Sequence, residues 1–248
     1  MLQTLQRAGD VLDLFTAEEP EWGVTATAQR LGVGKSLAHD ALASLAAIGL
    51  LQRVGHGRYR LGWRNLSLAA VLLRTSDLSA RARPVVRELA DRQNVTVSLV
   101  AWDRGRIVYI NRRHRPCGEI DPGPAPGATV PLDGSAAARV LLASRPDDEV
   151  TTLWSDGLVH SGHCCLADLR CDLECVRRDG WAIGPSAHPQ RHDAVAAPVR
   201  DRAGAVAAAV SLDLAGGLVA SGGDLGGRMV VAAASRITEA LRRCVAAG

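Results

Sequence analysis

Residues 55–62, with the sequence GHGRYRLG, place two arginines and a histidine among three glycines. Guanidinium and imidazole groups bind phosphate oxygens, and glycine lets a backbone come close to DNA. The surrounding stretch from residue 41 to residue 76 contains no Asp or Glu, so its positive charge is locally uncompensated. We therefore predict a nucleic-acid contact here, made by Arg53, His56, Arg58 and Arg60.

Three helical patterns precede this segment and would position it. Apolar residues recur at helical spacing over 5–15, and a second, short pattern runs from Thr25, which can cap a helix, to Gly32, which can end it. The third pattern starts at Ser36 as its cap. Its apolar stripe consists of Leu37, Ala41, Leu42, Leu45 and Ile48.

Two short strands follow, at 50–54 and 58–61, around a glycine-containing turn. Three helices and a hairpin predict a winged helix-turn-helix, in which the third helix presents polar side chains to base edges. The side chains off its apolar stripe are Lys35, Ser36, His39 and Asp40. We predict DNA contacts from Thr25, Lys35, Ser36 and His39 in addition to the hairpin residues.

The remaining chain predicts a second, α+β domain. A connecting helix at 63–73 and another helix at 78–94 lead into strands at 95–102 and 106–111. The later helical patterns lie at 135–144, 146–153, 166–179 and 224–245. Two alanine- and valine-rich runs, 194–199 and 206–212, predict a central hairpin, so helices and an antiparallel sheet share this domain.

Composition narrows the class of protein. A chain of 248 residues with 47% hydrophobic residues favours two globular domains, and a net charge of +3 does not by itself indicate nucleic acid. We find no signal peptide and no long apolar run, so we expect a cytoplasmic protein without a membrane partner. No catalytic motif stands out, and the aspartates suit turns and caps, so we expect neither an enzyme nor a bound cofactor.

The run KSLAHDALASLAAIGLLQRVGHGRYRLG resembles the DNA-binding domain of IclR-family transcriptional regulators. The runs PGATVPLDGSAAARVLLAS, RRDGWAIG and AVAAPVRDRAGAVAAAVSLD resemble the family's GAF-like effector-binding domain. The resemblance implies a winged helix-turn-helix at 1–62, a linker helix at 63–76 and a GAF-like effector domain at 77–248. It also implies a repressor that binds double-stranded operator DNA as a homodimer or a dimer of dimers and responds to a small-molecule effector.

Asp40 departs from the family, which usually has an arginine at this position. A carboxylate near phosphates is repulsive. Asp40 must therefore point away from DNA, read a cytosine amino group or weaken binding, and the sequence does not choose among these.

In the family the effector lies over the sheet, held by the start of a helix and by strand hydroxyls. The matching positions are Ser135, Ala136, Ala137, Ala194, Ser211 and Asp213, with His188, His192 and Asp193 in an adjoining loop as further polar contacts or as solvated residues. A helix N-terminus suits a carboxylate, so an organic acid is expected. Asp133, Gly184-Pro185 and Asp213 depart from the family, and an unpaired Asp213 would instead favour a neutral or cationic ligand.

A second hypothesis concerns metal or redox chemistry. One histidine and four cysteines fall close together in sequence, and thiolate and imidazole are the ligands of structural zinc. They are His163, Cys164, Cys165, Cys171 and Cys175. The spacing is not that of the usual zinc motifs, and reduced cysteine also serves as a small apolar residue, so both interpretations stay open.

Overall fold

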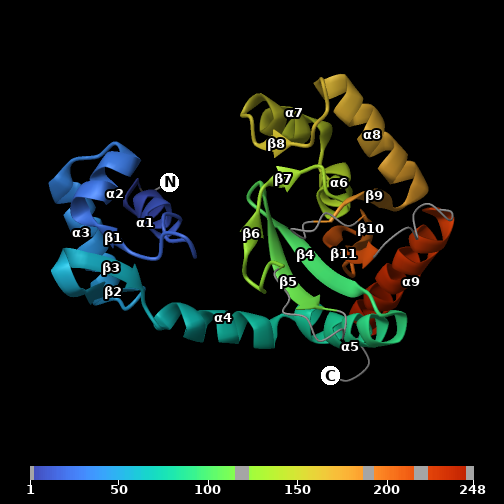
Figure 1. The fold of residues 1–248 in the computed structure, drawn as a ribbon, viewed down its shortest axis with the longest axis horizontal. Helices are drawn as coiled ribbons and strands as arrows, with labels where there is room; N and C mark the ends of the chain where they lie inside the picture. The colour runs from blue at the N-terminus through green and yellow to red at the C-terminus, as the bar shows by residue number, and fades with distance from the viewer. Residues whose placement is uncertain (1–2, 115–122, 187–192, 215–222, 244–248) are drawn as a thin grey trace. The chain divides into compact units, whose positions relative to one another are not determined.

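The computed structural model describes residues 3–114, 123–186, 193–214 and 223–243. Its chain divides into two compact units, Met1–Thr75 and Ser76–Gly248 (Figure 1). Within the described ranges, no helix is long and apolar enough to cross a membrane. Each unit has its own hydrophobic core and is described by itself.

The N-terminal unit contains three packed helices and a small sheet, as predicted, followed by a further helix. The packed helices are α1 (Gln3–Leu12), α2 (Val24–Leu31) and α3 (Lys35–Ala47), and the further helix is α4 (Arg64–Thr75). Its strands are β1 (Trp22–Gly23), β2 (Leu51–Val54) and β3 (Arg58–Leu61), and they pair in the order β1-β3-β2. Val11, Leu42, Leu45, Leu51 and Tyr59 form the core, so α1 and α3 close over the inner face of the hairpin.

Two predicted helix caps are wrong. The residues that cap α2 and α3 are Gly23 and Gly34, neither of which offers a side chain, so Thr25 and Ser36 lie inside the first turns. Gly23 pairs with Arg58 as part of β1, so the chain passes directly from strand into helix at Val24. The predicted stripe of α3 is also displaced, because Leu37 and Ile48 are exposed and Ala38 is buried in their place.

The C-terminal unit is built around a six-stranded antiparallel sheet of order β6-β5-β4-β11-β10-β9. These strands are β4 (Thr96–Asp103), β5 (Arg106–Arg113), β6 (Thr129–Val130), β9 (Ala182–Pro185), β10 (Asp193–Arg200) and β11 (Val206–Leu214). A parallel pair, β7 (Leu132–Asp133) and β8 (Val159–His160), stands apart. The helices are α5 (Asp77–Gln93), α6 (Ala136–Ala143), α7 (Asp147–Ser155), α8 (Leu166–Asp179) and α9 (Gly223–Arg242).

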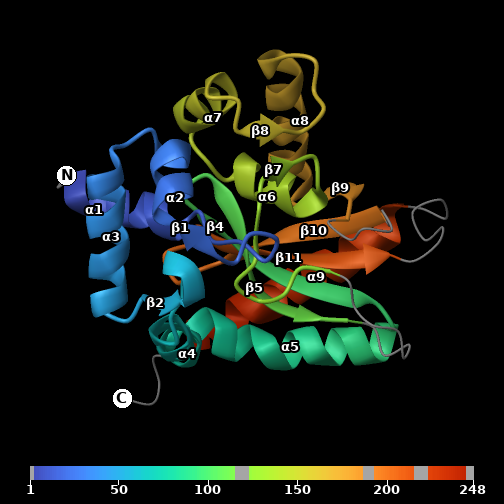
Figure 2. The same cartoon turned by 60° about the vertical axis from the view of Figure 1, so that its left-hand side comes forward.

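The two faces of this sheet differ in character. On one face α5 and α9 bury large aliphatic side chains, among them Leu99, Val210 and Leu212 (Figure 2). On the other face lie α6, α7 and α8, and α6 packs against strand residues that are mostly alanine. Because side chains alternate between the faces of a strand, the α6 face of β11 carries Ala209, Ser211 and Asp213. The small residues and buried polar groups of this face make it the candidate ligand site.

Candidate functional site

The predicted DNA-reading side chains of α3 all lie on its exposed surface. Lys35, Ser36 and His39 are exposed, whereas Ala38, Leu42 and Leu45 face the core. The Nδ1 atom of His39 lies 3.4 Å from Oδ1 of Asp40. α3 therefore offers solvent a short polar surface that contains both cationic and anionic groups.

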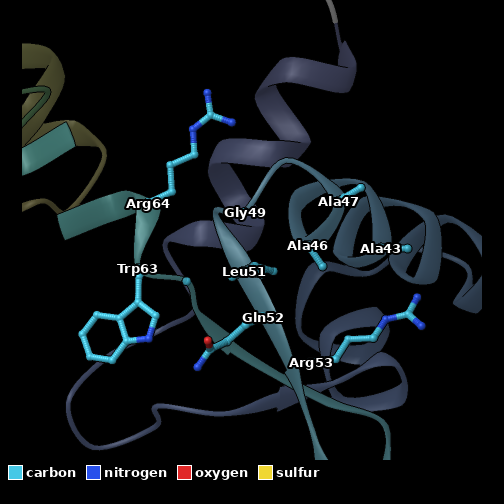
Figure 3. Close-up of a pocket in the computed structure, with 10 residues that line it drawn as sticks. Ala43, Ala46, Ala47, Gly49, Leu51, Gln52, Arg53, Trp63 and Arg64 are labelled. Carbon is cyan, nitrogen blue, oxygen red and sulfur yellow. The ribbon is translucent and has the colours of Figure 1, made fainter. Parts of the chain in front are cut away.

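The hairpin does not present its arginines on one face. Arg53 pairs with the buried Tyr59 in the β2–β3 register and its guanidinium lies 5.6 Å from the Tyr59 ring centroid. Arg58 and Arg60 alternate with Tyr59 along β3 and are exposed on the opposite face. Figure 3 shows Arg53 and its neighbour Gln52 leaving β2 in opposite directions. The predicted basic patch is thus divided between the two sides of the hairpin.

Arg58 is exposed, and its guanidinium also contacts Glu21, the residue before β1. Its Nη2 donates to the backbone carbonyl of Glu21 at 2.9 Å, and its Nε lies 3.5 Å from the Glu21 carboxylate. A groove of about 500 Å³ runs between the N-terminus of α2 and the hairpin, and Thr25, His56 and Arg58 all line it. The structure therefore brings these three predicted residues together and apart from Arg53.

A second hollow lies at the base of the hairpin, beside the end of α3 (Figure 3). It has a volume of about 730 Å³ and is lined by Ala43, Ala46, Ala47, Gly49, Leu51, Gln52, Arg53, Gly62, Trp63 and Arg64. Arg64 donates from Nη1 to the carbonyl of Ile48 at 2.5 Å, which fastens the start of α4 to the end of α3. Trp63 keeps 74% of its surface exposed at this junction.

In the C-terminal unit, the start of α6 is built as expected from the sequence. Ser135 is its N-cap, and its hydroxyl accepts from the amide of Ala138 at 3.3 Å. The amide of Ser135 donates to Asp133 at 3.1 Å, while Ala136 and Ala137 are buried. Gly184 of β9 approaches this turn so closely that a β-carbon there would lie 3.0 Å from the amide nitrogen of Ala136. Only a glycine leaves that space beside the helix N-terminus.

The sheet beneath α6 carries a buried polar layer. Asp213 lies between Thr96 and Ala194 in the register of β4, β11 and β10, and Ser211 lies between Ser98 and Ala196. Thr96, Ser98 and Ser211 are all buried, as is Ala194. The structure therefore places the predicted residues Ala194, Ser211 and Asp213 side by side. His188 and His192 lie outside the described residues, and Asp193 is exposed at the first position of β10.

Arg112 is the cation of this layer, and it was not predicted from the sequence. Nη2 of Arg112 lies 3.8 Å from Oδ2 of Asp213, and the two side chains are only 3% and 12% exposed. Burial, together with the neighbouring Asp213 carboxylate, raises the pKa of the Tyr109 phenol well above its ordinary value, which keeps the hydroxyl protonated. The sequence predicted that Asp213 would repel an anionic ligand, on the premise that its carboxylate had no cation nearby. Arg112 supplies that cation, so the premise does not hold.

The proposed metal or redox cluster is not supported. Among the residues that the structure describes, no group of three or more His, Cys, Asp or Glu side chains is placed to hold a metal ion. Cys164, Cys165, Cys171 and Cys175 are all free and exposed. His163 instead lies between the hydroxyl of Ser161, 2.7 Å from Nδ1, and Asp172, 3.6 Å from Nε2. Asp172 also forms a two-point pair with Arg139, so this network joins α6 to α8.

Comparison with known proteins matches both units. Residues 4–55 match the family model of the IclR helix-turn-helix domain, and residues 70–239 match that of the bacterial transcriptional regulator IclR C-terminal domain. The HTH-type transcriptional regulator XynR of Escherichia coli is 28% identical over 218 residues, which cover 86% of each chain.

Solved structures show the same fold. An IclR transcriptional regulator from Alicyclobacillus acidocaldarius superimposes with a TM-score of 0.78 and 22% identity, covering 97% of this chain and 99% of that one. An IclR homolog from Microbacterium hydrocarbonoxydans, solved in complex with 4-hydroxybenzoate, superimposes with a TM-score of 0.67 and 21% identity, covering 96% and 99%.

Proposed function

Because the chain belongs to the IclR family of bacterial transcriptional regulators, we propose that it is a repressor that binds operator DNA through its N-terminal unit. The observation that carries this proposal is the exposed polar surface of α3 beside an arginine-bearing hairpin. We assign residues 1–62 to DNA binding, 63–76 to the linker helix and 77–248 to effector binding. With this assignment we propose that the protein acts in the cytoplasm, where operator DNA lies, and that it catalyses no reaction.

Within the DNA-binding surface, the residues have different roles. Lys35, Ser36 and His39 face outward from α3 and would read bases in the major groove. Thr25, His56 and Arg58 line one groove and would hold one phosphate strand, with Arg60 on the same face of β3. Arg53 faces the other side of the hairpin and would contact the backbone next to α3.

The first test is a gel shift with the DNA upstream of the protein's own gene, across salt concentrations and with excess random competitor. We expect a salt-sensitive shift that resists the competitor. Replacing Arg58→Ala should weaken binding to specific and random DNA alike and reduce the slope of log affinity against log salt by about one.

The matched control is Arg87→Ala, which removes the same charge from the C-terminal unit, where Arg87 is 75% exposed. This variant should leave the slope unchanged. A loss confined to the specific sequence in Arg58→Ala would contradict a phosphate contact. A wild-type protein that binds the upstream DNA no better than random DNA would contradict the repressor role on that DNA.

We also propose that α4 joins two copies of the chain. Unlike the other long helices, α4 buries no side chain, and it exposes Leu66, Leu68, Val71 and Leu72 to more than half of their surface. Of these, Leu68, Val71 and Leu72 share one face of the helix. Exposed apolar patches of this kind mark interaction sites, and a second copy brings an identical apolar face. A dimer would place two α3 helices on the half-sites of a palindromic operator, and two dimers could pair on one DNA.

Replacing Leu68→Asp in α4 should therefore weaken self-association by roughly 100-fold, because the dimer would bury an unpaired carboxylate. Analytical ultracentrifugation measures this directly. Ser67→Asp adds the same charge to the polar side of α4 and should leave the dimer intact. Equal molecular masses for wild type and Leu68→Asp at every concentration would argue against α4 as the interface.

For the effector we propose a small organic acid bound between α6 and the sheet. The buried start of α6 and the Arg112 side chain both favour a carboxylate, and Ser211, Ser135 and Thr96 add hydroxyl groups. The Microbacterium relative, which holds a hydroxylated carboxylate, supports this class of ligand. A screen of small acids and amines for release of the gel shift tests it, and release by amines alone would contradict it.

A further inference from the structure

Asp40 occupies the part of α3 most remote from the core of its unit. Ala38, Leu42 and Leu45 mark the buried side of the helix, and Asp40 lies opposite, one turn after Ser36. Its side chain is 76% exposed, compared with 55% for the neighbouring His39. If α3 enters a major groove by its exposed face, as the proposed function requires, Asp40 is the carboxylate that meets the base edges.

A carboxylate at that place is selective because it only accepts hydrogen bonds. In the major groove, guanine and thymine present acceptors to it, and these repel a negative charge. Adenine presents a donor, N6, beside the acceptor N7, so part of the attraction is cancelled. Cytosine presents the N4 amino group with an acceptor on one side only, the O6 of its paired guanine, whereas adenine N6 lies between N7 and thymine O4. The chemistry of the groove therefore leaves cytosine as the base that a carboxylate prefers.

The neighbouring imidazole helps to fix the carboxylate. Nδ1 of His39 lies 3.4 Å from Oδ1 of Asp40, and in the tautomer that carries a proton on Nδ1 this nitrogen donates to that oxygen. The Asp40 side chain keeps 76% of its surface exposed, so its carboxylate stays accessible to a donor on DNA. Among the side chains that the structure describes around α3, His39 is the partner bonded to Asp40. Within the described ranges, Asp40 forms no ion pair with the hairpin or with α2 that would give it a structural role.

From this placement we propose that Asp40 is a specificity-determining residue that requires a C·G base pair at one position of each half-site, with Oδ2 accepting from cytosine N4. Guanine or thymine leaves the carboxylate desolvated near phosphates without a donor, and adenine offers a donor whose attraction its own N7 partly cancels, so rejection of wrong sequences is the main effect. This inference rests on the proposed function, because it needs α3 to face DNA.

The test is selection of duplexes with a randomised centre by the purified full-length protein, followed by binding measurements on the selected sequence. We expect one strictly selected C in each half-site, whose replacement by T weakens wild-type binding by ~10-fold. For Asp40→Ala, the same replacement should change binding by less than about 2-fold. Asp40→Asn should shift the preference at this position from C towards A, because an amide pairs with adenine N6 and N7.

The matched control is Glu18→Gln, which also removes an exposed negative charge from the N-terminal unit. Glu18→Gln should raise the affinity for every DNA sequence by the same fold-change and leave the selected bases unchanged. If Asp40→Ala does the same, Asp40 is only a repulsive charge and the inference is wrong, although the repressor proposal stands. If the wild type selects no sequence at all, both the inference and the proposed function are overturned.

Discussion

A Gly62→Ala variant is expected to lose about 3 kcal/mol of the free energy of unfolding of the N-terminal unit, because the added methyl group has no space. A β-carbon at residue 62 would overlap the carbonyl oxygen of Gly49 and lie 3.1 Å from that of Leu51. The backbone cannot retreat easily, since the amide of Gly62 donates to Leu50 at 2.8 Å and its carbonyl accepts from Asn65 at 2.9 Å.

Hydrogen exchange of the full-length variant measures this, because it follows residues 3–75 separately from the C-terminal unit. Faster exchange should appear in β2, β3 and the end of α3, with the C-terminal sheet unaffected. Gly9→Ala is the matched control, since a β-carbon there has nothing within 4 Å in α1. It should stabilise the unit by up to ~1 kcal/mol. If the hydrogen-exchange rates of Gly62→Ala equal those of the wild type, the close approach of Gly62 to the Gly49 backbone is contradicted.

The architecture could be predicted from the sequence because long periodic patterns decide it. The helix predicted at 166–179 has the bounds of α8, and the predicted central hairpin is β10 and β11 with small extensions. Two-residue strands such as β1 and β7 carry no periodicity, and their pairing depends on distant partners. β1 is also the reason that the cap of α2 was misplaced, since only pairing with β3 shows where the chain turns into helix.

The ligand site shows why a buried cation was missed. Ile107 and Tyr109 of β5 face α6, so simple alternation would place Asn111 on that side and Arg112 on the other. A bulge opposite Leu99 and Val100 inserts one residue into β5 and shifts this register. Arg112 consequently pairs with Ser98 and reaches Asp213 on the α6 face. A bulge is not visible in the local sequence, whereas the register around Ala194, Ser211 and Asp213 is regular and places these predicted residues side by side.

The second large expected effect is on the stability of the C-terminal unit, and it concerns the Arg112–Asp213 pair. Replacing Arg112→Met should destabilise the C-terminal unit by about 3–5 kcal/mol, because it removes the buried guanidinium that lies 3.8 Å from the buried Asp213 carboxylate. Urea unfolding followed by far-ultraviolet circular dichroism measures the loss. Arg92→Met is the matched control, since Arg92 is 74% exposed in its pair with Glu88, and it should change stability by less than about 1 kcal/mol.

The double variant Arg112→Met with Asp213→Leu separates stability from recognition. Replacing both charges with apolar groups also removes the buried carboxylate, so stability should return to within about 1 kcal/mol of the wild type. A double variant that stays as unstable as Arg112→Met would show that the loss of stability comes from packing around Arg112 and not from the Asp213 carboxylate in the interior.

The same double variant decides what the pair does for the ligand. A buried ion pair contributes little net stability compared with apolar residues, so its presence on the α6 face is explained best by recognition of a charged ligand. The double variant should therefore bind the operator as the wild type does and fail to release it with any acid that releases the wild type. Release at the same acid concentration would show that the effector is held by the start of α6 alone.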